Sequence, residues 1–185
     1  RSDAKGTDLL CVSGNLGAAY CGLQLLEREK SVYYMQLQGA RKKNKDAVVD
    51  FQPDFSGREY LLERQLQPEA RGDILKTLRQ AGVRPTSMID ISDGLSSEIM
   101  HICKESNTGC RLFEKEIPID YQTAVMAEEM NMNLSTCALN GGEDYELLFT
   151  CPIGDYEKVK ELDDIRIIGH ITKKELGTLL VTRDG

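Results

Sequence analysis

Two features missing from the sequence bear on where the protein works. No two of its six cysteines form a Cys-x-x-Cys pair, and most of them lie within apolar runs. That pattern favours reduced, buried thiols in a cytosolic protein over a disulfide framework or a zinc site. The chain also has no apolar run near the ~20 residues that a membrane-spanning helix needs, and we expect no signal peptide. We therefore predict a cytoplasmic protein that does not contact a membrane.

The sequence also lacks an excess of positive charge. Its 185 residues include 23 lysines and arginines against 30 aspartates and glutamates, which gives a formal net charge of −7. Because neutralising nucleic-acid phosphates requires a basic surface, we expect no nucleic-acid partner. An acidic protein can still bind a nucleotide when magnesium bridges its carboxylates to phosphate.

The overall composition is that of an ordinary globular protein. It is 41% hydrophobic and 29% charged, and its length suits one compact domain. The patterns predict strands and helices without strict alternation, which favours a layered α+β domain over a doubly wound α/β sheet. The predicted strands are 8–13, 87–92, 110–113, 145–150, 166–171 and 178–182, and the predicted helices are 16–29, 60–67, 73–80, 95–105, 122–132 and 155–162.

Three segments carry more specific structural predictions. We expect the last two strands to form a closing hairpin around Leu176-Gly177. The stretch from Lys30 to Gly57 is less regular and contains the basic cluster Arg41-Lys-Lys-Asn-Lys45. We interpret it as a solvated loop or an insertion, in preference to a specific anion site. The helix predicted over 95–105 has one buried face, formed by the residues at i, i+4, i+7 and i+8: Leu95, Ile99, Ile102 and Cys103.

The segment Ile89-Asp-Ile-Ser-Asp-Gly-Leu95 is the first to suggest chemistry. Asp90 lies inside an apolar strand, where a carboxylate is costly to bury unless a cation or hydrogen-bond donors satisfy it. Ser92 and Asp93 fall where the strand turns into a helix, a place where backbone N–H groups favour phosphate and Gly94 allows close approach. Two carboxylates and a hydroxyl at such a turn suit magnesium–nucleotide binding. The alternative makes Ser92 or Asp93 a plain helix N-cap, which leaves Asp90 unexplained.

The second such segment runs from Ala138 to Thr150. The pair Gly141-Gly142 leads the acidic residues Glu143, Asp144 and Glu146 into an apolar strand. The glycines allow a ligand or another backbone segment to come close, and the acids could bind a metal or a cationic group. The alternative is a tight turn with its acids facing solvent, and the residues by themselves slightly favour that alternative.

Other segments predict no chemistry. Gly14-Asn-Leu-Gly17 follows a strand but lacks both the Gly-x-Gly-x-x-Gly pattern and the Walker lysine, so we interpret it as a tight strand-to-helix turn. No arrangement of serine or cysteine makes His101 or His170 a catalytic base, and we assign neither a role.

Together and in this order, these segments resemble the bacterial thiamine-monophosphate kinases, members of the aminoimidazole-ribonucleotide-synthetase-like superfamily. The last two matching segments are the most specific. The matching segments are Arg1 to Leu10, Val12 to Gly17, Arg64 to Pro68 with Arg71, Ile89 to Leu95, and Gly141 to Leu147.

The resemblance implies that ATP donates its γ-phosphoryl group to the phosphate of thiamine monophosphate, giving thiamine pyrophosphate. In the family this is a direct, magnesium-assisted displacement without a phosphoenzyme, so the chain needs no catalytic nucleophile. Asp90 and Asp93 resemble the family's magnesium ligands, and Arg1 and Ser92 resemble its ATP contacts. Glu143 matches a contact with thiamine monophosphate. The resemblance gives Asp144 and Glu146 no direct contact with a ligand.

The resemblance also implies that residues 1–185 are a single C-terminal domain, a layered α/β/α domain with a mixed, largely antiparallel sheet. The family's N-terminal ATP and magnesium domain, which forms a homodimer, is absent, so we expect the isolated domain to be inactive. An aromatic substrate contact is expected beyond Gly185. Two alternatives stay open: another ATP-using superfamily member, such as a selenophosphate-synthetase-like or hydrogenase-maturation-like enzyme, or a non-catalytic nucleotide-binding domain.

Overall fold

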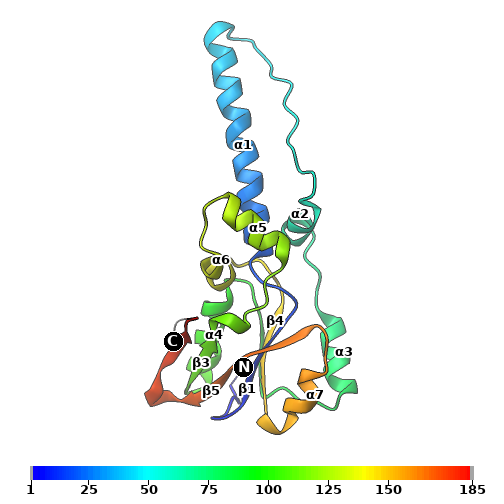
Figure 1. Cartoon of the computed structure of the whole chain (residues 1–185), viewed down its shortest axis with the longest axis vertical. Helices are drawn as coiled ribbons and strands as arrows, with labels where there is room; N and C mark the ends of the chain where they lie inside the picture. The colour runs from blue at the N-terminus through cyan, green and yellow to red at the C-terminus, as the bar shows by residue number, and fades with distance from the viewer. Residues whose placement is uncertain (1, 184–185) are drawn as a thin grey trace.

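The computed structural model describes residues 2–183, and a six-stranded sheet forms its centre (Figure 1). The strand order is β2-β4-β1-β5-β3-β6, and every neighbouring pair is antiparallel except β3 with β6. The predicted mixed, largely antiparallel sheet is therefore confirmed. The strands are β1 (Leu9–Ser13), β2 (Ser87–Asp90), β3 (Thr108–Phe113), β4 (Leu147–Cys151), β5 (Ile165–Lys173) and β6 (Thr178–Val181).

Helices cover both faces of the sheet, as the prediction of an α/β/α domain requires. Side chains alternate along β1, so Leu10 and Val12 pack beneath α4 (Leu95–Ser106) and α6 (Leu134–Asn140). Leu9 and Cys11 point the other way, toward α3 (Gly72–Gln80) and α7 (Tyr156–Lys160). The apolar face predicted for α4 is confirmed, because all four of its residues are buried: Leu95, Ile99, Ile102 and Cys103.

A third apolar cluster joins the remaining helices beyond one end of the sheet. It contains residues of α1 (Ala18–Lys43), α2 (Glu59–Leu66), α5 (Tyr121–Glu129) and α6. Gly22 of α1 lies against the backbone carbonyl of Leu61 in α2, where a side chain has no room, so the two helices cross closely. This cluster fixes the start of α1, which follows directly from β1.

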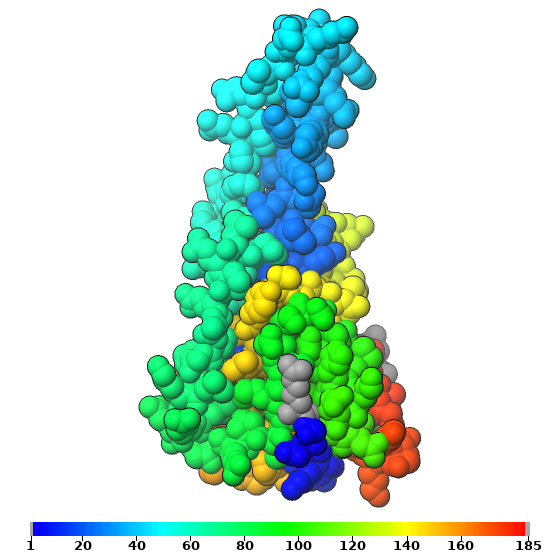
Figure 2. All heavy atoms as spheres, turned by 180° about the vertical axis from the view of Figure 1, so that it is seen from behind, coloured from blue at the N-terminus to red at the C-terminus, as the bar shows by residue number. Residues whose placement is uncertain are grey.

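The outer half of α1 corrects one prediction. The segment 30–43 is helical, and Figures 1 and 2 show it projecting as an arm, with residues 44–58 returning along it without helix or strand. Sequence pattern missed this half because Leu37 is its one buried hydrophobic residue, so no apolar stripe marks the helix. The basic residues Arg41 to Lys43 form the last turn of α1, where positive charge interacts favourably with the helix dipole and stabilises the helix. The interpretation of 30–57 as an insertion stays a prediction.

The predicted closing hairpin is wrong. Strand β6 pairs in parallel with β3 and not with β5, because the chain crosses over the end of β3. At this crossing the backbone N–H of Cys110 donates to the carbonyl of Gly177 at 3.1 Å. Gly109 permits the crossing, since a side chain there would collide with that same carbonyl. Short 3-10 turns complete the chain: η1 (Glu114–Glu116), η2 (Ile153–Asp155) and η3 (Lys174–Leu176).

The cysteines all lie in the interior. All six cysteines are buried and carry free thiols, and they fall into three neighbouring pairs: Cys11 with Cys151, Cys21 with Cys137, and Cys103 with Cys110. Within residues 2–183, no helix combines the length and the apolar character needed to span a bilayer.

Candidate functional site

The two motifs with predicted chemistry lie against each other at one end of β2 and β4. The backbone N–H of Glu143 donates to the carbonyl of Ser92 at 2.8 Å, and that of Tyr145 donates to the carbonyl of Ile91 at 2.9 Å. The N–H of Ile91 in turn donates to the carbonyl of Glu146 at 2.8 Å. Segments far apart in the sequence therefore form one continuous backbone platform.

Two glycines make this contact possible. Gly94 and Gly142 have φ angles of 109° and 68°, in the region that side chains disfavour. A Cβ on Gly94 would lie 2.8 Å from the carbonyl oxygen of Leu139, and one on Gly142 would lie 2.7 Å from that of Ser92. The close neighbour of each glycine is thus the backbone of the other motif.

The side chains of the first motif are more exposed than the sequence suggested. Asp90 is exposed, so the prediction of a buried carboxylate is wrong. The reason is position: β2 is an edge strand and Asp90 is its last residue. Asp93 is also exposed, and Ser92 is half-buried. The N-cap alternative is wrong too, since Gly94 holds the N-cap position of α4 and no side chain caps it.

One predicted phosphate donor already has a partner. The backbone N–H of Asp93 donates to Oε1 of Glu98 at 3.3 Å, and Glu98 is buried in the first turn of α4. The sequence prediction that the N–H groups of this turn are free for phosphate therefore does not hold for Asp93. The predicted ATP contact Arg1 lies outside the described residues.

Glu143 is exposed and lies beside an aromatic hydroxyl. The hydroxyl of Tyr145 donates to Oε2 of Glu143 at 3.1 Å. This hydrogen bond, the charge of Glu143 and the charges of Asp90 and Asp93 raise the pKa of Tyr145. The charges of the predicted site carboxylates Asp90, Asp93 and Glu143 thus all act on one phenol.

Asp144 points inward and caps a helix. It is 1% exposed, and its carboxylate accepts from the backbone N–H of Gly17 at 2.8 Å and of Ala19 at 3.3 Å. Burial raises its pKa to about 6, although these two N–H groups and Arg64 act in the opposite direction. The turn predicted over Gly14 to Gly17 is therefore confirmed, and Asp144 holds it at the start of α1.

Glu146 also points inward, between two arginines. Its carboxylate accepts from Oγ of Ser13 at 2.5 Å and pairs with Arg64 at 3.0 Å and Arg71 at 2.5 Å. Gly14 has no room for a side chain because the Glu146 carboxylate fills that space. The alternative of a turn with its acids facing solvent thus holds for Glu143 and is wrong for Asp144 and Glu146.

The sequence predicts no role for Arg64, Arg71 or Ser13, although one signal could have shown that Glu146 needs partners of this kind. Side chains two apart on a strand share a face, which places Glu146 on the same side as the core residue Leu148. A carboxylate on that face needs cationic or hydrogen-bonding partners.

The exposed carboxylates of the first motif suit magnesium chemically. Neither Asp90 nor Asp93 forms an ion pair with any described residue, so hard oxygen donors are available. Over residues 2–183, no group of three or more His, Cys, Asp or Glu side chains comes close enough to hold a metal. Magnesium commonly uses one or two protein carboxylates together with waters and substrate phosphates, so a pair of donors fits this ion.

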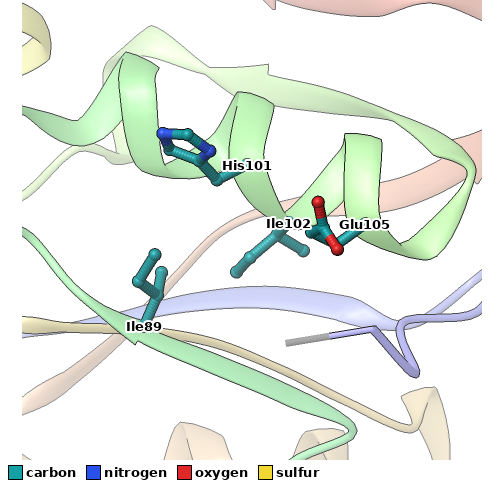
Figure 3. Close-up of a pocket in the computed structure, with 4 residues that line it drawn as sticks. All are labelled: Ile89, His101, Ile102 and Glu105. Atoms are coloured by element: carbon teal, nitrogen blue, oxygen red, sulfur yellow. The ribbon is translucent and has the colours of Figure 1, made fainter.

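A separate pocket lies between β2 and α4, with a volume of about 280 Å³ (Figure 3). It is lined by Ile89, His101, Ile102 and Glu105. Its lining includes none of the predicted site residues, so the candidate site is an exposed surface and not this pocket.

The chain has similar sequences among curated proteins, although no protein-family model matches it. It is 30% identical over 190 residues to thiamine-monophosphate kinase of Buchnera aphidicola subsp. Schizaphis graminum, covering 98% of this chain and 50% of that protein. It is 34% identical over 155 residues to thiamine-monophosphate kinase of Escherichia coli O157:H7, covering 82% and 39%. The chain spans about half the length of the curated relatives it matches, or less.

The chain also superposes on solved structures. Thiamine monophosphate kinase from Aquifex aeolicus superposes with a TM-score of 0.74 at 29% identity, covering 97% of this chain and 52% of that one. A structure of AaThiL complexed with AMPPCP and TMP gives a TM-score of 0.73 at 28% identity, covering 97% and 49%. The hydrogenase maturation protein HypE of E. coli shares the fold alone, with a TM-score of 0.60 at 17% identity over 95% of this chain and 46% of that one.

Proposed function

This chain is a homologue of the thiamine-monophosphate kinases that spans one domain, and we propose that it supplies part of such an enzyme's active site. The reaction transfers the γ-phosphoryl group of ATP to thiamine monophosphate and gives thiamine pyrophosphate and ADP. One observation carries the proposal most strongly. The two motifs interlock through their backbones and present Asp90, Asp93 and Glu143 on one exposed surface.

In this proposal the first motif serves the nucleotide. Asp90 and Asp93 would hold magnesium, which when bound neutralises charge on the phosphates. The Ser92 hydroxyl and the guanidinium of Arg1 would contact ATP, in line with the resemblance of both to family contacts. An acidic surface of this kind would repel a free nucleotide, so it suits a nucleotide that arrives with its metal.

The second motif serves the acceptor. Thiamine monophosphate carries a cationic thiazolium ring, and the exposed carboxylate of Glu143 is suited to a cationic or hydrogen-bonding group. Holding donor and acceptor side by side places an acceptor phosphate oxygen in line with the γ-phosphorus. That oxygen forms the new bond while the bond to the departing ADP oxygen breaks. No residue of the chain needs to act as a nucleophile, because positioning and charge neutralisation supply most of the catalysis.

We further propose that the chain is the C-terminal domain of a cytoplasmic homodimeric enzyme. Its relatives are about twice as long, which supports a second domain that supplies further magnesium ligands. An aromatic substrate contact would follow Gly185, and residues 30–57 would be an insertion that forms the arm.

Turnover by the complete enzyme with different acceptors tests the proposal. We expect ATP-dependent formation of thiamine pyrophosphate from thiamine monophosphate and no phosphorylation of selenide. Phosphorylation of selenide in its place would favour a selenophosphate-synthetase-like enzyme. ATP binding without turnover on any acceptor would favour a non-catalytic nucleotide-binding domain.

A further inference from the structure

The hydroxyl of Tyr145 forms a hydrogen bond within the second motif. It donates to the Glu143 carboxylate at 3.1 Å, and the charges of Asp90 and Asp93 also act on it. Tyr145 is half-buried, whereas Glu143 is exposed. The hydrogen bond between the two side chains is itself exposed.

The backbone of this loop is fixed in an unusual shape. Glu143 and Tyr145 have φ angles of 62° and 52°, in the left-handed region that non-glycine residues adopt only where the surroundings impose it. The surroundings do so here. The backbone N–H groups of both residues are bonded to the first motif, and Asp144 between them is anchored at the start of α1.

The shape sorts the side chains of the loop into two sets. Asp144 and Glu146 turn inward, where the helix start and the two arginines hold them. Glu143 and Tyr145 are left on the outer side, within hydrogen-bonding distance of each other. An exposed glutamate without such a partner populates several rotamers, and a ligand that binds it must immobilise it first. The tyrosine hydroxyl reduces that freedom before the ligand arrives.

We propose that Tyr145 is a positioning residue that orients the Glu143 carboxylate for the acceptor substrate. The inference rests on the proposed function, in which Glu143 contacts thiamine monophosphate. Tyr145 acts through Glu143 and needs no contact of its own with the substrate.

Replacing the hydroxyl alone tests this role in the complete enzyme. Tyr145→Phe keeps the ring and removes the hydrogen bond. We expect kcat/KM for thiamine monophosphate to fall roughly three- to tenfold, mainly through KM, because one exposed hydrogen bond that orients the charged Glu143 is lost. The KM for ATP stays unchanged. The matched control is Tyr121→Phe, at a residue that is 79% exposed at the start of α5, and it leaves both constants at the wild-type values.

A double-mutant cycle then separates a positioning role from a direct one. In a Glu143→Ala background, Tyr145→Phe should cause no further loss, because the carboxylate that it orients is gone. A merely structural tyrosine would instead lower activity by the same factor in both backgrounds, and that result overturns the inference. The inference is also overturned if Tyr145→Phe has wild-type kinetics while Glu143→Ala is impaired, and in that case the proposed function stands. If Glu143→Ala leaves the KM for thiamine monophosphate unchanged, the proposed role of Glu143 fails and the inference fails with it.

Discussion

Glu146 provides a quantitative test of what holds the loop in place. Its side chain is 2% exposed and lies between those of Arg64 and Arg71, which are 17% and 14% exposed. Glu146→Gln keeps the volume and leaves an amide oxygen that still accepts from Ser13. It removes the negative charge between two guanidinium groups, which then repel each other across a buried site.

The size of the loss follows from this geometry. Removing one partner of a buried ion pair commonly costs about 3–5 kcal/mol. Arg71 keeps an ion pair with the exposed Asp73 at 2.9 Å, and both arginines reach solvent in part. We therefore expect a loss at the lower end of that range, about 3 kcal/mol in the free energy of unfolding.

Urea unfolding of the chain, followed by circular dichroism at neutral pH, measures this loss. Glu143→Gln is the matched control, because it makes the same chemical change in the same motif on an exposed side chain. We expect it to change the free energy of unfolding by less than ~0.5 kcal/mol. If Glu146→Gln is no more destabilising than Glu143→Gln, the buried ion pairs do not hold this loop.

Four further predictions concern activity and pH. In the complete enzyme, Asp90→Asn should lower turnover far more than stability; unchanged turnover at limiting magnesium would make Asp90 a structural residue. Glu143→Gln should weaken apparent affinity for thiamine monophosphate by about 1–3 kcal/mol and leave that for ATP unchanged, as steady-state kinetics with each substrate varied would show. The isolated chain should fold yet show little kinase activity, and near-native turnover would contradict the proposed division of labour. Because burial raises the pKa of Asp144 to about 6 from its ordinary value of 3.8, the folded chain binds more protons than the unfolded chain between these pH values. The contribution of Asp144 to the free energy of unfolding thus falls as pH rises through this window. Asp144→Asn should make the decrease in the free energy of unfolding between pH 4 and pH 7 smaller by up to about 3 kcal/mol, as urea unfolding at the two pH values would measure.

Several features were determined by the sequence itself. The spacing of Leu95, Ile99 and Ile102 gave the buried face of α4, because helical periodicity alone decides which side chains line up. The strands β1 and β4 and the turn at Gly14 to Gly17 were likewise readable from local pattern. The two chemical motifs could also be recognised from the order of their residues, without knowing that they touch.

Only the tertiary structure decided which acidic residues face solvent. Asp90 was expected to be buried and is exposed, because β2 lies at the edge of the sheet and ends at that residue. Glu146 enters the interior because β4 lies between β2 and β1, and Arg64 of α2 and Arg71, just before α3, come from a distant part of the sequence to meet it. Local sequence does not reveal the place of a strand in the sheet, and that place sets the cost of burying a charge.

Sequence pattern also failed to predict the arm and the pairing of the last strand. Helix α1 continues to Lys43 through a stretch without an apolar stripe, so hydrophobic pattern gave no sign of it. The sequence predicts that β6 pairs with β5, its neighbour in sequence. Strand β6 instead lies beyond β3, because Gly109 leaves space for the chain to cross. Sequence pattern specifies which residues form a strand, whereas the choice of partner depends on space that distant residues leave open.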